Sequence, residues 1–226
     1  MKKNAAVSAP AQTTSATRKI AVLALLSAIG FISAITIRVP VITFLKYEPK
    51  DIFITFAGLL YGPLATLACS VVAAVLEMPF GETGLIGMVM NILSTAAFSC
   101  TASLIYKKRR DISGAAIGLV CGVAFMSVSM LLWNYLITPL YSHIPREQVV
   151  PMLTTVFLPF NLLKAGINAG LTLLLYRPFL RVLHICGYQT EEHFNEKKKS
   201  SIIVIAAAAA VLLAVCIGIV IFLNVK

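Results

Sequence analysis

Long apolar runs dominate this chain and restrict the architectures that it can adopt. Five of them are long enough for one helix each to cross the hydrocarbon core of a bilayer, which takes roughly 20 residues. They occupy residues 20–37, 85–106, 115–138, 155–179 and 202–223. Charged residues make up 12% of the sequence, against about 25% in soluble domains. The pattern predicts an all-α membrane protein.

Residues 51–78 form a further apolar region, which is either one long crossing or two short ones separated at Gly62-Pro63. Basic clusters decide between the two, because positively charged loops gather on the cytoplasmic side of a membrane. Two crossings place every basic cluster on one side: Lys2, Lys3, Arg18, Lys19, KKRR at 107–110, Arg177, Arg181 and the lysines at 197–199. Proline also breaks a helix because it lacks a backbone donor. We therefore predict a cytoplasmic bend at Gly62-Pro63.

The first of these two crossings is unusually short. Residues 51–61 span only about 17 Å as a helix, which is less than the thickness of a bilayer core. We expect neighbouring helices to shield this segment, or the preceding loop at 38–51 to dip into the membrane.

The resulting organisation has four parts. Residues 1–17 are interpreted as a disordered cytoplasmic tail, 18–184 as a six-transmembrane-helix substrate-binding bundle, 185–200 as a charged linker, and 201–226 as an additional C-terminal seventh transmembrane helix. The run at 20–37 is long for a signal peptide and no small-x-small cleavage site follows it, so we expect a retained helix.

Several function classes find no support in the sequence. The formal charge is +10, but no basic face interleaved with aromatic residues occurs, so no nucleic-acid partner is predicted. The five cysteines are scattered without a C-x-x-C pair, which indicates neither a disulfide framework nor a metal site. G-x-x-x-x-G-K-[ST], H-E-x-x-H and G-x-S-x-G are absent, so an enzyme, and in particular a P-loop ATPase, is not predicted.

Polar residues inside the last core span are the strongest functional signal. In FLPFNLLKAGINAG (157–170), Asn161, Lys164 and Asn168 fall on one stripe of one helix face. A lysine at mid-membrane costs about 2.5–3.5 kcal/mol on insertion scales, and such residues usually face a cavity or a partner. Lys164 could instead extend its ammonium to the interface, and the asparagines could join helices to one another.

Asn134 and Asn91 lie near the outer ends of two other spans, in the same half of the bundle as Asn161 and Lys164. Amides and one ammonium beside aromatic rings suit a flat heteroaromatic ligand, whose rings stack while the amides read its edge. The nearby rings are Trp133, Tyr135, Tyr141, Phe157, Phe160, Phe44 and Tyr47. An interfacial aromatic belt would also account for some of them, Trp133 included.

Three segments carry a resemblance to a known family. FLKYEPKDIFITFAGLLYGPLA (44–65), WNYLITPLY (133–141) and LPFNLLKAGIN (158–168) resemble the RibU family, the riboflavin-specific S components of energy-coupling factor (ECF) transporters. The N-x-x-K at Asn161 and the N-Y-x-x-x-P-L-Y at Asn134 are the discriminating pieces. The resemblance runs from about Arg18 to Arg181 and keeps the order of the motifs.

The resemblance implies a six-helix fold with cytoplasmic ends and a flavin site near the outer face, under the loop between the first two helices. Asn134, Asn161 and Lys164 match positions that hydrogen-bond flavin, and residues 43–48 match the loop that covers it. The predicted substrate-binding residues are therefore Asn134, Asn161, Lys164, Thr43, Phe44, Lys46, Tyr47, Glu48, Trp133 and Asn91. Riboflavin, or FMN as well, is expected as transported ligand, with no cofactor.

The resemblance also implies partners: a transmembrane T component and two ATP-binding cassette ATPases, in a bacterial cell membrane, with the N-terminus of this multi-pass chain cytoplasmic. An Ala-x-x-x-Ala face on the family's first helix docks the T component, and Ala24 and Ala28 match it here. Small residues let membrane helices approach closely, which gives the motif a physical reason.

Three other functions stay open at this point. The same fold could bind another vitamin. A solitary proton-coupled secondary transporter would need a carboxylate within the bundle, for which Glu77 is the candidate near the interior of a span. A purely structural membrane scaffold would bind no ligand.

Overall fold

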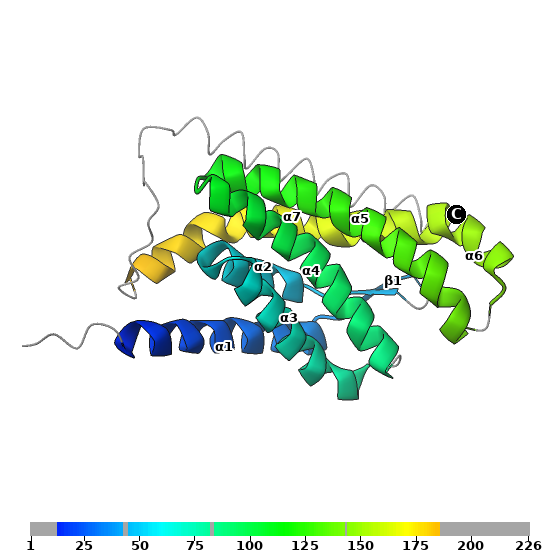
Figure 1. Cartoon of the computed structure of the whole chain (residues 1–226), viewed down its shortest axis with the longest axis horizontal. Helices are drawn as coiled ribbons and strands as arrows, with labels where there is room; N and C mark the ends of the chain where they lie inside the picture. Colours follow the sequence, from blue (N-terminus) through cyan, green and yellow to red (C-terminus); the bar gives the residue numbers. More distant parts are fainter. Residues whose placement is uncertain (1–12, 43–44, 82–83, 143, 186–226) are drawn as a thin grey trace, which may run out of the picture.

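A computed structural model describes residues 13–42, 45–81, 84–142 and 144–185, and shows a helical bundle with one small hairpin (Figure 1). In chain order the elements are α1 (Thr13–Thr36), β1 (Val39–Ile42), β2 (Leu45–Tyr47), α2 (Lys50–Tyr61), α3 (Pro63–Glu77), a 3₁₀ turn (Met78–Phe80), α4 (Gly84–Lys108), α5 (Ile112–Ser142), α6 (Arg146–Met152), a π-helical turn (Leu153–Phe157) and α7 (Leu158–Ile185). The predicted all-α fold class is confirmed.

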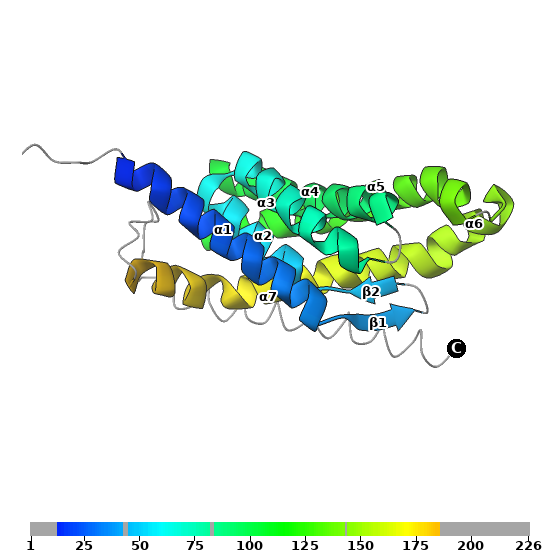
Figure 2. The same ribbon diagram turned by 90° about the horizontal axis from the view of Figure 1, so that it is seen from below.

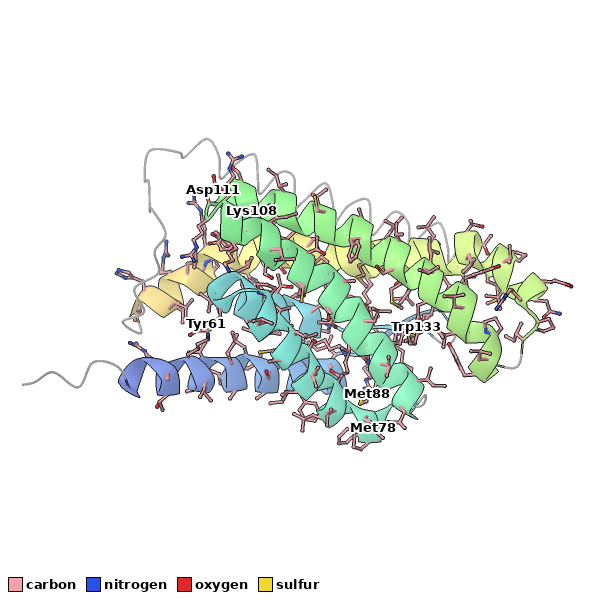
Figure 3. All side chains as sticks on the ribbon, viewed as in Figure 1. Tyr61, Met78, Met88, Lys108, Asp111 and Trp133 are labelled. Carbon is pink, nitrogen blue, oxygen red and sulfur yellow. The ribbon has the colours of Figure 1, made fainter. Side chains whose placement is uncertain are left out.

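The ends of the helices gather at two poles of the bundle. The start of α1, the α2–α3 junction, the α4–α5 turn and the end of α7 lie at one pole (Figures 1 and 2). Figure 3 labels Tyr61, Lys108 and Asp111 there, and Met78 and Met88 towards the other pole. We call the first pole the basic end, because its helix termini carry Arg18, Lys19, Lys107, Lys108, Arg109, Arg110, Arg177 and Arg181. The second pole, which holds β1 and β2, is the hairpin end.

Within the described residues, five helical stretches are long and apolar enough to cross a membrane: Ala16–Thr36, Pro63–Phe80, Gly84–Lys108, Ile112–Ser142 and Arg146–Ile185. The twelve residues of α2 are too few for this, but most of them are buried among α1, α3, α4 and α7. Neighbouring helices therefore shield the short crossing, as the sequence led us to expect.

The predicted break at Gly62-Pro63 is confirmed. Gly62 has a φ of 90°, a left-handed conformation that glycine adopts without the steric strain of a side chain. Pro63 follows at the first position of α3, where its missing N–H would have no intrahelical partner in any case. The two residues together end one helix and begin the next within a single turn.

The connection between α1 and α2 forms an antiparallel hairpin that was not predicted from the sequence. Val39 pairs with Tyr47 and Pro40 with Lys46. The strands are too short for their alternation to be distinguished from loop sequence. Whether this connection dips into a membrane stays a prediction.

Close packing of α4 on α5 organises the core. A Cβ atom at Gly118 or Gly122 would lie 2.6 Å from the carbonyl oxygens of Ala102 and Phe98 respectively, so glycine permits a backbone approach that no larger residue allows. The buried cluster around this contact includes Phe98, Met126, Ala165 and Ala169 from α4, α5 and α7.

Some parts of the predicted organisation lie outside the described residues. These are residues 1–12 of the tail, 186–200 of the linker and the whole of 201–226, the predicted seventh helix. Helix α1 begins at Thr13, earlier than the predicted boundary at residue 18.

Candidate ligand-binding site

A cavity of ≈ 150 Å³ lies at the hairpin end of the bundle. The hairpin, α3, α4, α5, the π-helical turn and α7 all contribute to its wall. The lining residues include six of the ten predicted substrate-binding residues: Lys46, Glu48, Asn91, Asn134, Asn161 and Lys164. Residues that are more than 100 positions apart in the chain thus meet around one hollow.

One wall of the cavity comes from α5, the π-helical turn and α7, and we call it the amide wall. It is formed by Met130, Asn134, Phe157, Phe160, Asn161 and Lys164. Asn134 Nδ2 donates to the backbone oxygen of Met130 at 2.7 Å, and Asn161 Nδ2 donates to that of Phe157 at 2.8 Å. These bonds fix the orientation of both amides, which retain further donors and acceptors for a ligand.

The π-helical turn directly precedes this wall. It spans Leu153–Phe157, and Leu158 N donates to Leu153 O at its end. Pro159 follows immediately and has no backbone N–H to continue the regular ladder, which explains why the hydrogen-bonding pattern changes at this point. Turns of this kind occur often at functional sites.

Lys164 is buried on the amide wall, with 6% of its surface exposed. Its Nζ lies 4.0 Å from Oδ2 of Asp51. That distance allows electrostatic compensation of the ammonium but is too long for a hydrogen bond. Asp51 therefore stabilises the charge of Lys164, but the contact between them occupies none of the three N–H donors of the ammonium.

Asp51 is the main residue of this region that was not predicted from the sequence. It is fully buried in the first turn of α2, where the helix dipole favours a negative charge. Thr95 Oγ1 donates to its Oδ1 at 2.7 Å, and Asn168 Nδ2 donates to its Oδ2 at 3.2 Å. Its position at the start of an apolar run resembled a loop boundary, so the sequence offered no sign that it would be buried.

Asn168 and Tyr47 belong to this internal cluster. Tyr47 OH donates to Asn168 Oδ1 at 2.9 Å, and both residues are buried. Neither is among the residues that line the cavity in the described part of the chain. Tyr47 therefore ties the hairpin to α7, and the stripe predicted from Asn161 to Asn168 divides between the cavity and the core.

The rest of the lining, which we call the charged wall, comes from the hairpin, α3 and α4. Its charged and polar members are Arg38, Lys46, Glu48, Glu77, Asn91 and Ser94. Of these, Arg38, Glu77 and Ser94 were not among the predicted substrate-binding residues; Glu77 was considered only as the carboxylate that a secondary transporter would need.

An ionic chain runs along the charged wall and joins the hairpin to α3. Arg38 Nε lies 3.1 Å from Glu48 Oε1, and Lys50 Nζ lies 3.4 Å from Glu48 Oε2. Lys50 also forms an ion pair with Glu77 Oε2. Two bases and two acids alternate, so the chain is neutral as a whole, and each charge has an opposite neighbour in a poorly solvated region.

One further predicted site residue, Trp133, is not among the residues that line the cavity in the described structure. Trp133 lies on α5 near the hairpin end and packs, half-buried, against the core cluster of α4, α5 and α7 (Figure 3). Thr43 and Phe44, which lie between β1 and β2 in the sequence, are outside the described residues. Their predicted contacts with a ligand stay predictions.

The two alanines predicted to dock a partner lie on the outside of α1. Ala24 and Ala28 are exposed, with the exposed Ile32 one turn further along. Gly30 and Ala34, one face over, are buried, and Gly30 lies close to the backbone of Lys50 on α2. The small residues of α1 thus serve internal packing on one face and leave the other face open.

Comparison with known proteins places this bundle in a family. The family described as the substrate-specific component of ECF transporters matches residues 18–176, which cover most of the bundle and every described residue that lines the cavity.

This chain is an ECF transporter S component.

Curated relatives of this S component are riboflavin transporters. One from Bacillus subtilis, named riboflavin transporter FmnP, is 31% identical over 65% of this chain and 84% of its own length. A riboflavin transporter named RibU from Streptococcus thermophilus is 25% identical over 74% of this chain and 85% of its own length. A third, also named RibU, comes from Staphylococcus aureus and is 26% identical over 71% of this chain and 89% of its own length.

A solved structure shares the fold. It is described as the S component of a bacterial ECF transporter and aligns with a TM-score of 0.64 at 26% identity, covering 74% of this chain and 98% of its own. The overall fold of this bundle is therefore shared with a solved S component of an ECF transporter. A multi-pass membrane protein follows from the family and from the apolar helices.

Proposed function

We propose that this S component binds riboflavin in the cavity at the hairpin end. The observation that supports this best is the amide wall, where a buried ammonium and two fixed amides stand beside two phenyl rings. Lys164 supplies the ammonium, Asn134 and Asn161 the amides, and Phe157 and Phe160 the rings. An isoalloxazine ring has carbonyls and ring nitrogens at its edge, which can bond to the ammonium and the amides. It also has a flat apolar face, which can pack against the phenyl rings.

Each residue of the amide wall has a distinct role in this proposal. Lys164 donates to a flavin carbonyl or ring nitrogen, with Asp51 compensating its charge from behind. Asn134 and Asn161 bond to the ring edge or to ribityl hydroxyls. The hairpin, with Thr43, Phe44, Lys46 and Glu48, covers the ligand.

The proposed transport cycle needs partners. A transmembrane T component docks against Ala24 and Ala28 on α1, and two ATP-binding cassette subunits hydrolyse the ATP, so this chain is a transport subunit and not an enzyme. The basic end faces the cytoplasm, which places the start of α1 and the end of α7 inside and the cavity at the hairpin end towards the exterior. Riboflavin is captured from outside and released inside a bacterial cell.

A fluorescence titration of the purified protein in detergent tests the proposed ligand. Riboflavin fluorescence should be quenched as protein is added, saturating at one flavin per chain, because an excited flavin accepts an electron from a nearby tryptophan or tyrosine side chain, such as Trp133 next to Asn134 on α5. FMN should be titrated in parallel to define the flavin accepted, with biotin and thiamine as competitors that leave the quenching unchanged. Saturable binding of another vitamin with no response to flavin would overturn the proposal.

A further inference from the structure

Glu77, at the end of α3, has one carboxylate oxygen fully bonded and the other without a partner. Oε2 contacts Lys50 and accepts from Asn91 Nδ2 at 3.4 Å. Oε1 is buried and has no hydrogen-bond partner within the described residues. The residue as a whole is 3% exposed and lines the cavity.

A buried carboxylate oxygen requires a donor to replace the water that it has lost. An anionic acceptor is also a strong one, since hydrogen bonds to charged groups are shorter and stronger than bonds between neutral groups. The ion pair with Lys50 holds Oε2 and so fixes the orientation of the Glu77 carboxylate. The unbonded oxygen is thus a vacant acceptor beside the hollow.

The two walls of the cavity differ in what they can recognise. The amide wall combines phenyl rings with fixed amides and so suits the flat ring of a flavin. The charged wall presents Arg38, Lys46, Glu48, Glu77 and Asn91, which are hydrogen-bonding groups with no phenyl ring among them. A chain of hydroxyl groups, each both a donor and an acceptor, matches that wall.

We propose that Glu77 is a specificity-determining residue whose Oε1 accepts a hydrogen bond from a hydroxyl of the ligand's polyol chain. This inference rests on the proposed function and adds an orientation to it: the ring lies on the amide wall and the ribityl chain extends along the charged wall to α3.

A pair of ligands that differ only in the polyol tests this orientation. Riboflavin carries the ribityl chain, and lumiflavin carries the same ring with a methyl group in its place. Glu77→Gln should weaken riboflavin binding about tenfold, the difference between a charge-assisted and a neutral hydrogen bond. Lumiflavin binding should change by less than about twofold, because the ring contacts remain. Equal effects on both ligands, or no effect on riboflavin, would overturn the proposal.

A matched control removes a buried carboxylate outside the cavity wall. Asp51→Asn alters the surroundings of Lys164 and hence the ring contacts, so it should weaken both flavins by the same factor and leave their ratio unchanged. Retained lumiflavin binding by Glu77→Gln shows that the variant is folded. If it binds neither ligand, Glu77→Asp provides the second variant: it keeps the charge beside Lys50 but draws the carboxylate back by one methylene, and it should again weaken riboflavin selectively.

The wild-type titrations separate this inference from the proposed function. A wild-type protein that binds neither flavin overturns both. A wild-type protein that binds riboflavin, with variants that leave the riboflavin-to-lumiflavin ratio unchanged, overturns only the role of Glu77.

Discussion

Asp51 on α2 and Asn168 on α7, 117 positions apart in the chain, are joined at the centre of the bundle by a 3.2 Å hydrogen bond from Asn168 Nδ2 to Asp51 Oδ2. The same asparagine accepts from Tyr47 of the hairpin through its Oδ1. Lys164 lies one helical turn before Asn168 and faces the same carboxylate. One carboxylate thus links the short helix α2, the hairpin and the cation of the cavity.

The first prediction concerns Lys164. Replacing it with Ala removes the ammonium that we assign to the flavin ring, and should weaken riboflavin binding at least tenfold, or about 1.4 kcal/mol. Equilibrium titration by flavin fluorescence measures this. Lys108→Ala, an exposed lysine at the basic end, is the matched control and should bind like the wild type. Unchanged affinity in the Lys164 variant would remove the residue from the site.

The second prediction concerns the stability that Asp51 provides. Asp51→Ala leaves Lys164 buried without an anion and deprives Thr95 and Asn168 of their acceptor. Removing one partner of a buried pair typically costs about 3–5 kcal/mol, so the free energy of unfolding should fall by about that amount. Unfolding in detergent, followed by circular dichroism, reports it.

A surface carboxylate serves as the comparison for Asp51. Glu147 is exposed on α6, and Glu147→Ala should change the free energy of unfolding by less than about 0.5 kcal/mol. Similar losses in the two variants would mean that the buried cluster does not carry the stability we assign to it.

The third prediction concerns the exposed face of α1. Ala24→Trp and Ala28→Trp should each prevent the T component from copurifying, because a large ring blocks the close helix approach that small residues allow. Flavin binding should persist, since both alanines lie outside the cavity wall. Val128→Trp places the same ring on an exposed face of α5 and should leave assembly intact. Intact complexes in all three variants would place the docking surface elsewhere.

The fourth prediction concerns orientation. A cysteine that replaces Arg110, at the basic end, should react with a membrane-impermeant maleimide in inverted vesicles and not in intact cells, because the basic end faces the cytoplasm. The five native cysteines should first be replaced by Ala. Labelling in intact cells would reverse the topology that we propose.

Much of the fold could be predicted because it depends on local signals. Apolar runs of helical length indicated the long helices, and the basic clusters selected a break at Gly62-Pro63 that the backbone confirms. Asn134, Asn161 and Lys164 could be placed together because each is a polar residue in an apolar helix, and such residues rarely face lipid. The cavity brings all three into one wall.

The partners of these residues could not be predicted, because they depend on contacts between distant segments. From the sequence, Asp51 was interpreted as the boundary of a helix. Asn168 was interpreted as lying with Asn161 and Lys164 on one stripe of a helix face. In the structure the side chain of Asp51 is buried and accepts hydrogen bonds from Thr95 and Asn168. A buried carboxylate needs such donors, and they come from whichever helices surround it. The hairpin was missed for a related reason: strands this short are defined by their pairing, not by a sequence period.

The sequence by itself determined that the chain is a membrane bundle, where its helices break, and which polar side chains are too costly to face lipid. Hydrophobicity and proline act locally, so the order of residues is enough to specify their effect. Only the tertiary structure decided which charge neutralises which, and which groups were left open to the cavity. Burial makes an unpaired charge expensive, but the chain can satisfy it only through neighbours that folding has already brought together.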